Sequence, residues 1–289
     1  MSSSPVHLVG TGTHDTATPD VHTASAPYAQ RFAGPTGEWM LERQASGVRD
    51  LLEHIAVSSS TTRLRVLDMG GGHGQLTRLL LDAGHEVVVQ GSHESCFQLL
   101  RPEHPDLDSC VASSLWRLPF AAGTFDLVIG VRLLAHVRAW KALLAEMSRV
   151  SRRWVVVEFA RTHGLLDIGP LGRTIFRLKQ RLERTPRPFY TYSEKAVSSA
   201  LEECGLQVTR VHAQFMVPMF MHRTLRSPSI SSGLESSLAR LGAGTKLRSP
   251  VLLLAERGAV VAPKSGAASP AAVYGSAEAP SESAVPALG

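Results

Sequence analysis

Residues 64–77 read Leu-Arg-Val-Leu-Asp-Met-Gly-Gly-Gly-His-Gly-Gln-Leu-Thr, and this stretch decides the fold. The apolar residues before Asp68 suit a buried parallel strand, and the glycines after it allow a sharp turn with no Cβ between backbone and ligand. A helix that begins near Gly74 would direct its free N–H groups into that turn. Glycine-rich turns also serve as plain strand-to-helix connections. Because Asp68 precedes Gly70 by two residues, we favour a nucleoside-binding turn.

The composition predicts one folded domain between two tails. The chain has 289 residues, of which 44% are hydrophobic and 19% charged, enough for the core of one domain. Residues 1–26 are rich in Ser, Thr, Pro, Ala and His, and residues 259–289 in Ala, Ser, Pro and Gly. Such segments bury too little apolar surface to offset the entropy of ordering. We therefore expect disordered tails at 1–26 and 259–289 and a domain over 27–258.

The sequence shows no targeting or metal-binding pattern. No apolar run approaches the ~20 residues of a membrane helix, and the first residues lack the basic and apolar regions of a signal peptide. Cys96, Cys110 and Cys204 have neither metal-ligand spacing nor the even number of a disulfide framework. We expect a soluble cytoplasmic protein without a metal site.

The formal net charge of +5 comes mostly from dispersed basic residues. The densest basic segment is 173–187, which contains five arginines and one lysine. Such a run is typical of a solvated helix face. The alternative is contact with an anionic substrate, a membrane surface or RNA.

Short apolar runs alternate with helical stretches over the first 160 residues, which is typical of βαβ units and a parallel sheet covered on both faces. Right-handed crossovers make such a sheet doubly wound. The predicted strands are 65–69, 86–90, 109–112, 125–130 and 154–159. The predicted helices are 38–55, 74–83, 94–101 and 139–150.

The pattern loosens after residue 159. We expect an insertion with a basic helix at about 160–190 and a second one at about 222–248. Between them, Ser193 can cap a helix over 193–203 that ends at Gly205. The remaining strands are expected over 207–217 and 250–256.

Several motifs resemble those of class I S-adenosylmethionine-dependent methyltransferases. Residues 66–74 resemble the first motif of this family. Residues 118–130, Leu-Pro-Phe-Ala-Ala-Gly-Thr-Phe-Asp-Leu-Val-Ile-Gly, resemble the signature that leads into its fourth strand. Residues 132–137 and the helical segment after them are similar to the ubiquinone/menaquinone-biosynthesis branch, whose domain is of type 11. The likeness covers about residues 60–160 and is specific for the superfamily, not for the substrate.

The resemblance implies an α/β fold: a doubly wound, mostly parallel seven-stranded sheet in the order 3-2-1-4-5-7-6, with the last strand antiparallel, in one domain with two insertions. It also implies S-adenosyl-L-methionine as cofactor. The residues that it places around the cofactor are Asp68, Gly70, Gly72 and Gly74 at the methionine and ribose, and Val131 and Arg132 near the methyl donor. Tyr28 would close the donor pocket, or it is a surface aromatic before a helix.

The sequence departs from the family at two polar anchors. Relatives carry an acidic residue at the end of the second strand, where it accepts hydrogen bonds from the ribose hydroxyls; here this position is Gly91. A charged hydrogen bond contributes roughly 1.5 to 3 kcal/mol, so we expect Ser92 or Glu94 to replace it. The Asp that holds the adenine amino group is replaced by Ser113, with Ser114 beside it.

Methyl transfer needs mainly alignment of the reacting atoms, and a base only where the acceptor keeps its proton. His136 follows the fourth strand and is the candidate base; the alternative is a structural histidine. Tyr190, Tyr192, His212 and His222 are weaker candidates. An apolar cluster at 215–221 is either core or the wall of an acceptor pocket.

We expect methyl transfer to a small, apolar or aromatic metabolite. The alternative is a degenerate nucleoside-binding or interaction module without turnover, favoured by the two missing carboxylates. Methylation of RNA or protein stays open because of the basic segment. Nicotinamide-dependent oxidoreduction is disfavoured, because the glycine spacing is offset from the dinucleotide pattern.

Overall fold

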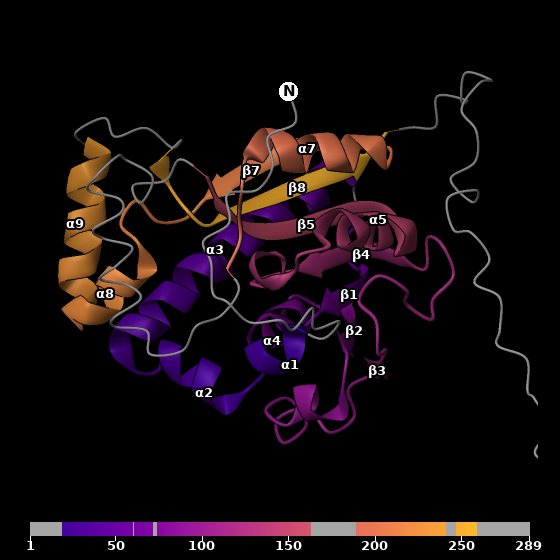
Figure 1. Cartoon of the computed structure of the whole chain (residues 1–289), viewed down its shortest axis with the longest axis horizontal. Coiled ribbons are helices and arrows are strands. Elements are labelled where there is room, and N and C mark those ends of the chain that lie inside the picture. The colour runs from indigo at the N-terminus through magenta and orange to yellow at the C-terminus, as the bar shows by residue number, and fades with distance from the viewer. Residues whose placement is uncertain (1–18, 60, 72–73, 163–188, 241–246, 259–289) are drawn as a thin grey trace, which may run out of the picture. The chain divides into compact units, whose positions relative to one another are not determined.

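Residues 65–69 form a strand inside a mostly parallel sheet, around which the described helices are arranged (Figure 1). The computed structural model describes residues 19–59, 61–71, 74–162, 189–240 and 247–258. The strands are β1 (Arg65–Met69), β2 (Glu86–Gly91), β3 (Ser109–Val111), β4 (Phe125–Gly130), β5 (Ser151–Arg161), β6 (Thr191–Tyr192), β7 (Leu206–Ala213) and β8 (Val251–Arg257). The helices and 3-10 turns are α1 (Pro19–Thr23), α2 (Ala26–Ala29), η1 (Gln30–Phe32), α3 (Gly34–Ser59), α4 (Gln75–Asp82), η2 (Glu94–Phe97), η3 (Leu134–His136), α5 (Trp140–Val150), α7 (Glu194–Glu203), α8 (Met219–Leu225) and α9 (Pro228–Arg240).

The strand order confirms the predicted fold class. The sheet runs β3-β2-β1-β4-β5-β8-β7, and the two-residue β6 pairs with β5 beside this path. The pairs from β3 to β5 are parallel, whereas β8 is antiparallel to both β5 and β7. Asp68 pairs in register with Val89 of β2 and Ile129 of β4, which places it at the carboxyl end of the central strand. The order reverses between β1 and β4, where ligands bind in open α/β sheets.

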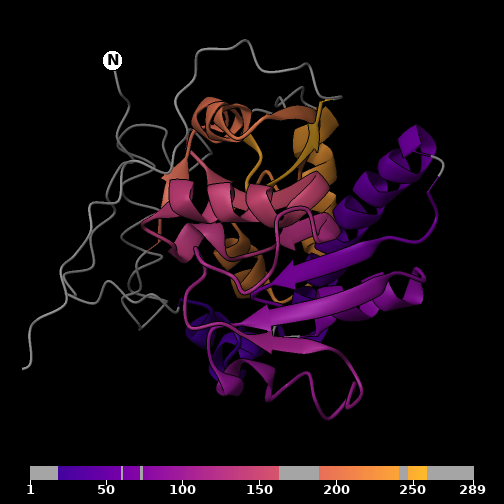
Figure 2. The same ribbon diagram turned by 90° about the vertical axis from the view of Figure 1, so that its right-hand side faces the viewer.

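Two apolar layers hold the sheet between helices. Successive residues of β1 alternate, so that Val66 packs with α3 and α4 and Leu67 with α5 and α7. The 26-residue helix α3 buries Leu51 and Ile55 on the first face. Figure 2, turned by 90°, shows the parallel strands with the helices packed on them. Because both faces are covered, the carboxyl edge of the sheet is left to hold a ligand.

The helix predicted after Ser193 is confirmed, and so is the capping role of Ser193. The Ser193 side chain accepts a hydrogen bond from the Ala196 N–H, and Gly205 follows the helix with φ +77°. A hydroxyl N-cap and a left-handed glycine after the helix are the expected end signals.

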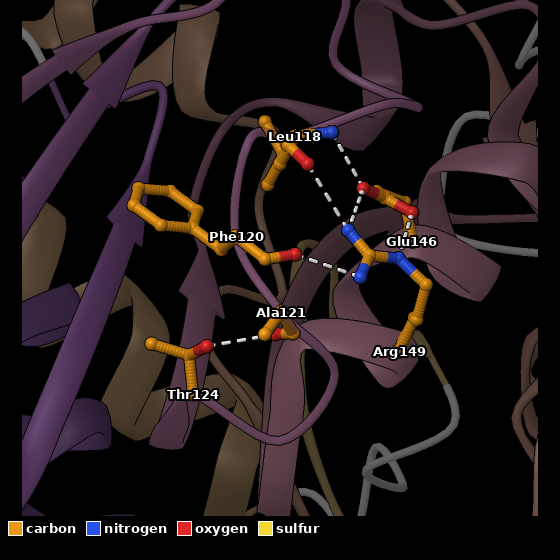
Figure 3. Close-up of polar contacts among 6 residues, drawn as sticks. All are labelled: Leu118, Phe120, Ala121, Thr124, Glu146 and Arg149. Atoms are coloured by element: carbon orange, nitrogen blue, oxygen red, sulfur yellow. Dashed lines mark hydrogen bonds and ion pairs between the residues drawn. The ribbon is translucent and has the colours of Figure 1, made fainter.

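The segment between β3 and β4 is held in place by side chains of α5 (Figure 3). The Leu118 N–H donates to Glu146 Oε1 at 2.5 Å, and Arg149 donates to the carbonyls of Leu118 at 3.1 Å and Phe120 at 2.8 Å. Arg149 also binds both carboxylate oxygens of Glu146. Burial would raise the pKa of Glu146, but the Arg149 and Leu118 hydrogen bonds outweigh it and hold that pKa below its usual value. The Leu-Pro-Phe signature is thus fixed by an ion pair behind it.

Two predicted boundaries were wrong. The helix predicted over 94–101 is only the short turn η2, and the residues after it continue as separate hydrogen-bonded turns. The strand predicted over 207–217 ends at Ala213, because the N–H groups of Met216 and Val217 donate to the buried carboxylate of Glu235 instead of to a strand. Helices α8 and α9 lie in the region of the predicted second insertion, whose bounds stay a prediction.

The N-terminal boundary also differs from the prediction. Residues 19–23 were assigned to a disordered tail but form α1, and α2 begins at residue 26. The physical reason is a tertiary contact: Asp20 of α1 is fully buried and accepts two hydrogen bonds from Ser92. Composition alone does not report such a contact. Most of the first insertion, with the basic segment, and the predicted C-terminal tail lie outside the described residues. No helix among the described residues is long and apolar enough to cross a membrane.

Replacing Glu146 by Gln keeps its shape but removes the charge that pairs with Arg149. We expect the free energy of unfolding to fall by about 1–3 kcal/mol, since Arg149 loses its ion pair and the Leu118 N–H its charged acceptor. Urea unfolding at pH 7 measures this. The matched control is Glu42→Gln, which breaks an exposed pair with Arg49 and should cost less than about 1 kcal/mol. Equal losses in the two variants would contradict a structural role for Glu146.

Candidate functional site

The turn between β1 and α4 folds directly over the Asp68 carboxylate. Gly70 and Gly74 adopt φ +72° and +75°, which side chains other than glycine disfavour. A Cβ placed on Gly71 would lie 2.2 Å from Asp68 Oδ2, so this position has no room for any side chain. Gly70 and Gly74 were predicted from the sequence, whereas Gly71 was not. Gly72 lies outside the described residues.

Asp68 is buried beneath this turn. Its Oδ2 accepts a hydrogen bond from the Thr77 hydroxyl of α4 at 2.8 Å. Burial raises the pKa of Asp68 to about 6, although the Thr77 hydrogen bond and the nearby charge of Arg132 act in the opposite direction. A desolvated carboxylate of this kind attracts a cationic group strongly. Asp68 is therefore suited to hold an amino group of a ligand.

Arg132 follows β4 and faces the same region. Its backbone adopts φ +59°, the left-handed conformation, and its N–H donates to Glu158 Oε2 at 2.8 Å. The guanidinium donates from Nη2 to Gln75 Oε1 at 3.1 Å and lies over the Phe32 ring, with Cζ 4.9 Å from the ring centroid. Its other terminal nitrogen, Nη1, is buried and has no hydrogen-bond partner in the described part of the chain. This nitrogen is available to bind an anionic group.

These groups line one cavity at the carboxyl ends of β1 and β4. It is small, and the space inside it that a water molecule can enter is about 20 Å³. Its lining residues are Thr23, Asp68, Gly70, Gly71, Gln75, Leu76, Val131 and Arg132. The structure thus brings together Asp68, Gly70, Val131 and Arg132, as predicted from the sequence. Thr23, Gln75 and Leu76 were missed because no motif marks them.

The end of β2 differs from an ordinary ribose-binding strand end. A Cβ on Gly91 would lie 2.7 Å from Cys96 Cβ and 2.9 Å from Phe97 Cζ, so the space of a side chain is filled by η2. Ser92, the next residue, is buried, and both its N–H and its hydroxyl donate to Asp20 at 2.6 Å. Asp20 was missed because it lies in the segment predicted to be disordered.

The other predicted polar anchors lie away from the cavity lining. Glu94 forms an exposed ion pair with Arg101 at 2.5 Å, and so the proposed replacement of the ribose carboxylate by Glu94 finds no support. Ser113 is exposed and Ser114 half-buried after β3, and neither lines the cavity. Their contact with an adenine ring stays a prediction.

Tyr28 and His136 come together in an aromatic cluster near Arg132. Tyr28 is buried, with ring centroids 6.3 Å from His136 and 6.0 Å from Phe32. His136, in η3, also lies edge-to-face with Phe189 at 5.9 Å. Neither Tyr28 nor His136 lines the cavity itself, but Phe32 connects them to the Arg132 guanidinium. Their roles at the donor and the acceptor stay predictions.

The weaker candidates have structural partners. The Tyr192 hydroxyl donates to the Val137 carbonyl at 2.9 Å, and His212 lies 3.6 Å from Asp50 on the outer part of the sheet. The Tyr190 N–H donates to the Ala135 carbonyl. His222 is buried against Glu235, 3.1 Å away. In the 215–221 cluster, Phe215, Met216 and Phe220 are buried, which favours the core interpretation for them.

Part of the chain is similar to known methyltransferases. Residues 67–154 match a family model described as a methyltransferase domain. A methyltransferase of Mycolicibacterium gilvum without assigned substrate is 31% identical over 165 residues, covering 52% of this chain and 64% of that protein. A demethylmenaquinone methyltransferase of Renibacterium salmoninarum is 35% identical over 99 residues, covering 33% and 41%. The chain thus spans less than two thirds of these relatives.

The fold also matches a solved structure. The magnesium protoporphyrin IX methyltransferase of Synechocystis PCC 6803, crystallised with bound SAH, superposes with a TM-score of 0.58 at 16% identity, covering 85% of this chain and 100% of that one. Residues 67–154 are thus similar to a methyltransferase domain, and the chain shares its fold with this solved methyltransferase. The matched model is that of the type 11 methyltransferase domain.

The raised pKa of Asp68 predicts a pH-dependent cost in the ligand-free protein. Between pH 3.8, the usual pKa of this group, and about pH 6, the folded state retains a proton on Asp68 that the unfolded state has released. The stability that this group contributes is therefore lost as the pH rises through 6. Asp68→Asn lacks this loss. From pH 5 to pH 8, its unfolding free energy should therefore gain about 1 kcal/mol relative to wild type. Urea unfolding of both proteins at the two pH values measures this, and a pH-independent difference would contradict it.

Proposed function

We propose that this protein transfers a methyl group from S-adenosyl-L-methionine to a small, apolar or aromatic metabolite by in-line displacement. The observation that carries the proposal is the cavity beside the glycine turn, where the Asp68 carboxylate and the Arg132 guanidinium lie at the carboxyl ends of neighbouring strands. A site with one anionic and one cationic side chain is complementary to the amino acid part of the methyl donor.

The residues of the cavity fit this cofactor. Asp68 would hold the amino group, and the buried Nη1 of Arg132, without a partner in the described residues, would hold the carboxylate. Gly71 lines the cavity and would face the ribose with its backbone, while its lack of a side chain makes room for the Asp68 carboxylate. When bound, the cofactor supplies a methyl group on a positively charged sulfur, which is an activated leaving group.

The protein's own contribution is alignment and exclusion of water. Leu76 and Val131 give the cavity apolar walls, and Thr23 of α1 also lines it. Holding donor and acceptor in line within such a site lowers the entropic part of the barrier. A general base is needed only for an acceptor that keeps its proton.

The aromatic cluster of Tyr28, Phe32, His136 and Phe189 supports a flat apolar acceptor. The Arg132 guanidinium lies over the Phe32 ring, so the cluster begins at the edge of the donor cavity. Relatives named demethylmenaquinone methyltransferases agree with an aromatic acceptor. His136 would accept a proton from the acceptor in this arrangement.

The second candidate is a nucleoside-binding module without turnover. It is favoured by the end of β2, where the packing of Cys96 and Phe97 leaves no space for a ribose carboxylate at Gly91. The first candidate requires donor binding and methyl transfer, whereas the second requires binding without methyl transfer.

Donor binding is tested by titration calorimetry with S-adenosylmethionine and S-adenosylhomocysteine. Gly71→Ala should weaken both affinities at least tenfold, because its Cβ would meet the Asp68 carboxylate at 2.2 Å. The matched control is Gly233→Ala on α9, where a Cβ meets nothing within 4 Å, and its affinity should equal that of wild type. Wild-type protein that binds neither ligand would overturn the proposed function.

Turnover is tested with a labelled donor and a panel of hydroquinones, phenols and polar metabolites. His136→Asn should lower kcat at least tenfold for a hydroxyl acceptor, because the proton acceptor is lost, while the affinity for the donor stays unchanged. An unchanged kcat would make His136 a structural residue. Donor binding without labelled product from any acceptor would favour the binding module, and label in added RNA or protein would replace the small-molecule assignment.

A further inference from the structure

We propose that Asp20, on the N-terminal helix α1, supplies the ribose-binding carboxylate that the second strand lacks. This inference rests on the proposed function, because it assigns a residue to the same cofactor site. It places an anchor of the cofactor outside the matched domain, in a segment without any family motif.

The end of β2 cannot carry this carboxylate. At Gly91, Cys96 Cβ would stand 2.7 Å and Phe97 Cζ 2.9 Å from an added Cβ. Both side chains are buried, so a larger residue would require η2 to move. Any carboxylate at this strand end must therefore come from another part of the chain.

Asp20 occupies the corresponding place. Its Oδ2 accepts the Ser92 N–H and its Oδ1 accepts the Ser92 hydroxyl, both at 2.6 Å. The Asp20 Cβ also lies 3.6 Å from a Cβ built on Gly70, so the residue is between the glycine turn and the end of β2. Thr23, one turn further along α1, lines the cavity. Asp20 does not itself line the cavity, but it lies next to the glycine turn that does.

The carboxylate retains acceptor capacity. Two carboxylate oxygens offer about four lone-pair sites, and Ser92 uses one on each oxygen. The Cys96 thiol, a weak donor, also donates to Oδ2 at 3.6 Å, which leaves one acceptor site on Oδ1. Asp20 is fully buried. An unused acceptor site on a buried carboxylate is costly; one ribose hydroxyl would satisfy it, and a second would replace the weak thiol contact.

The test compares two ligands that differ only at the sugar: S-adenosylhomocysteine and its 2′-deoxyribose analogue. Wild-type protein should bind the ribose form about tenfold more tightly, the value of a charged hydrogen bond. Asp20→Asn should weaken binding of the ribose form about tenfold and reduce the preference to about twofold or less. Because misfolding lowers both affinities together, their ratio is insensitive to it. The matched control is Asp82→Asn in an exposed pair with Arg78, which should keep the wild-type ratio.

The outcomes separate this inference from the proposed function. If wild-type protein binds S-adenosylhomocysteine and Asp20→Asn keeps the full ribose preference, Asp20 is not the anchor and the proposed function stands. If Asp20→Asn raises the affinity for both ligands equally, the carboxylate hinders ligand binding instead of supporting it. This result would also overturn the inference. If wild-type protein binds neither ligand, the proposed function and the role of Asp20 are both wrong.

Discussion

The burial of Asp68 under its own glycine turn is the constraint on which the site depends. The carboxylate can stay there only because Gly71 has no side chain, since a Cβ would come within 2.2 Å of it. The same geometry starts α4, whose Thr77 binds the carboxylate, and aligns the turn with Arg132 across the neighbouring strand. A single steric condition therefore fixes the strand end, the helix start and the position of the charge.

Glu158 extends this arrangement to distant parts of the chain. Its Oε1 accepts hydrogen bonds from Gln44 of α3 at 2.7 Å and from Gln214 after β7 at 2.5 Å. Its Oε2 accepts the Arg132 N–H. A buried carboxylate with donors from three elements is well satisfied and rigid. The leading helix and the segment that follows β7 are thereby connected to the backbone that presents the guanidinium.

Much of the fold could be predicted from the sequence, because the central strands and helices carry strong local patterns. The apolar run before Asp68 and the Ser193 cap each depend on neighbouring residues, and both were placed correctly. Asp68, Gly70, Val131 and Arg132 follow from motifs at strand ends, where parallel strands bring side chains to one edge.

The remainder depends on contacts that no local pattern reports. Asp20 is ordered by Ser92, a residue 72 positions further on, although its own surroundings have the composition of a tail. The crowding at Gly91 arises from the path of η2. Likewise, the strand expected over 207–217 stops early because Glu235, from a later helix, captures two backbone N–H groups. These features are determined by tertiary contacts between residues that are distant in the sequence.

The backbone conformation of Arg132 has a consequence for affinity. A residue with a Cβ loses roughly 1–2 kcal/mol in the left-handed region, and the hydrogen bond to Glu158 helps to offset that loss. This cost is incurred when the chain folds and not when a ligand arrives. The guanidinium is held by Gln75 and the Phe32 ring in advance, so little side-chain entropy remains to be lost on association. The structure thus exchanges some folding stability for a preorganised cationic group.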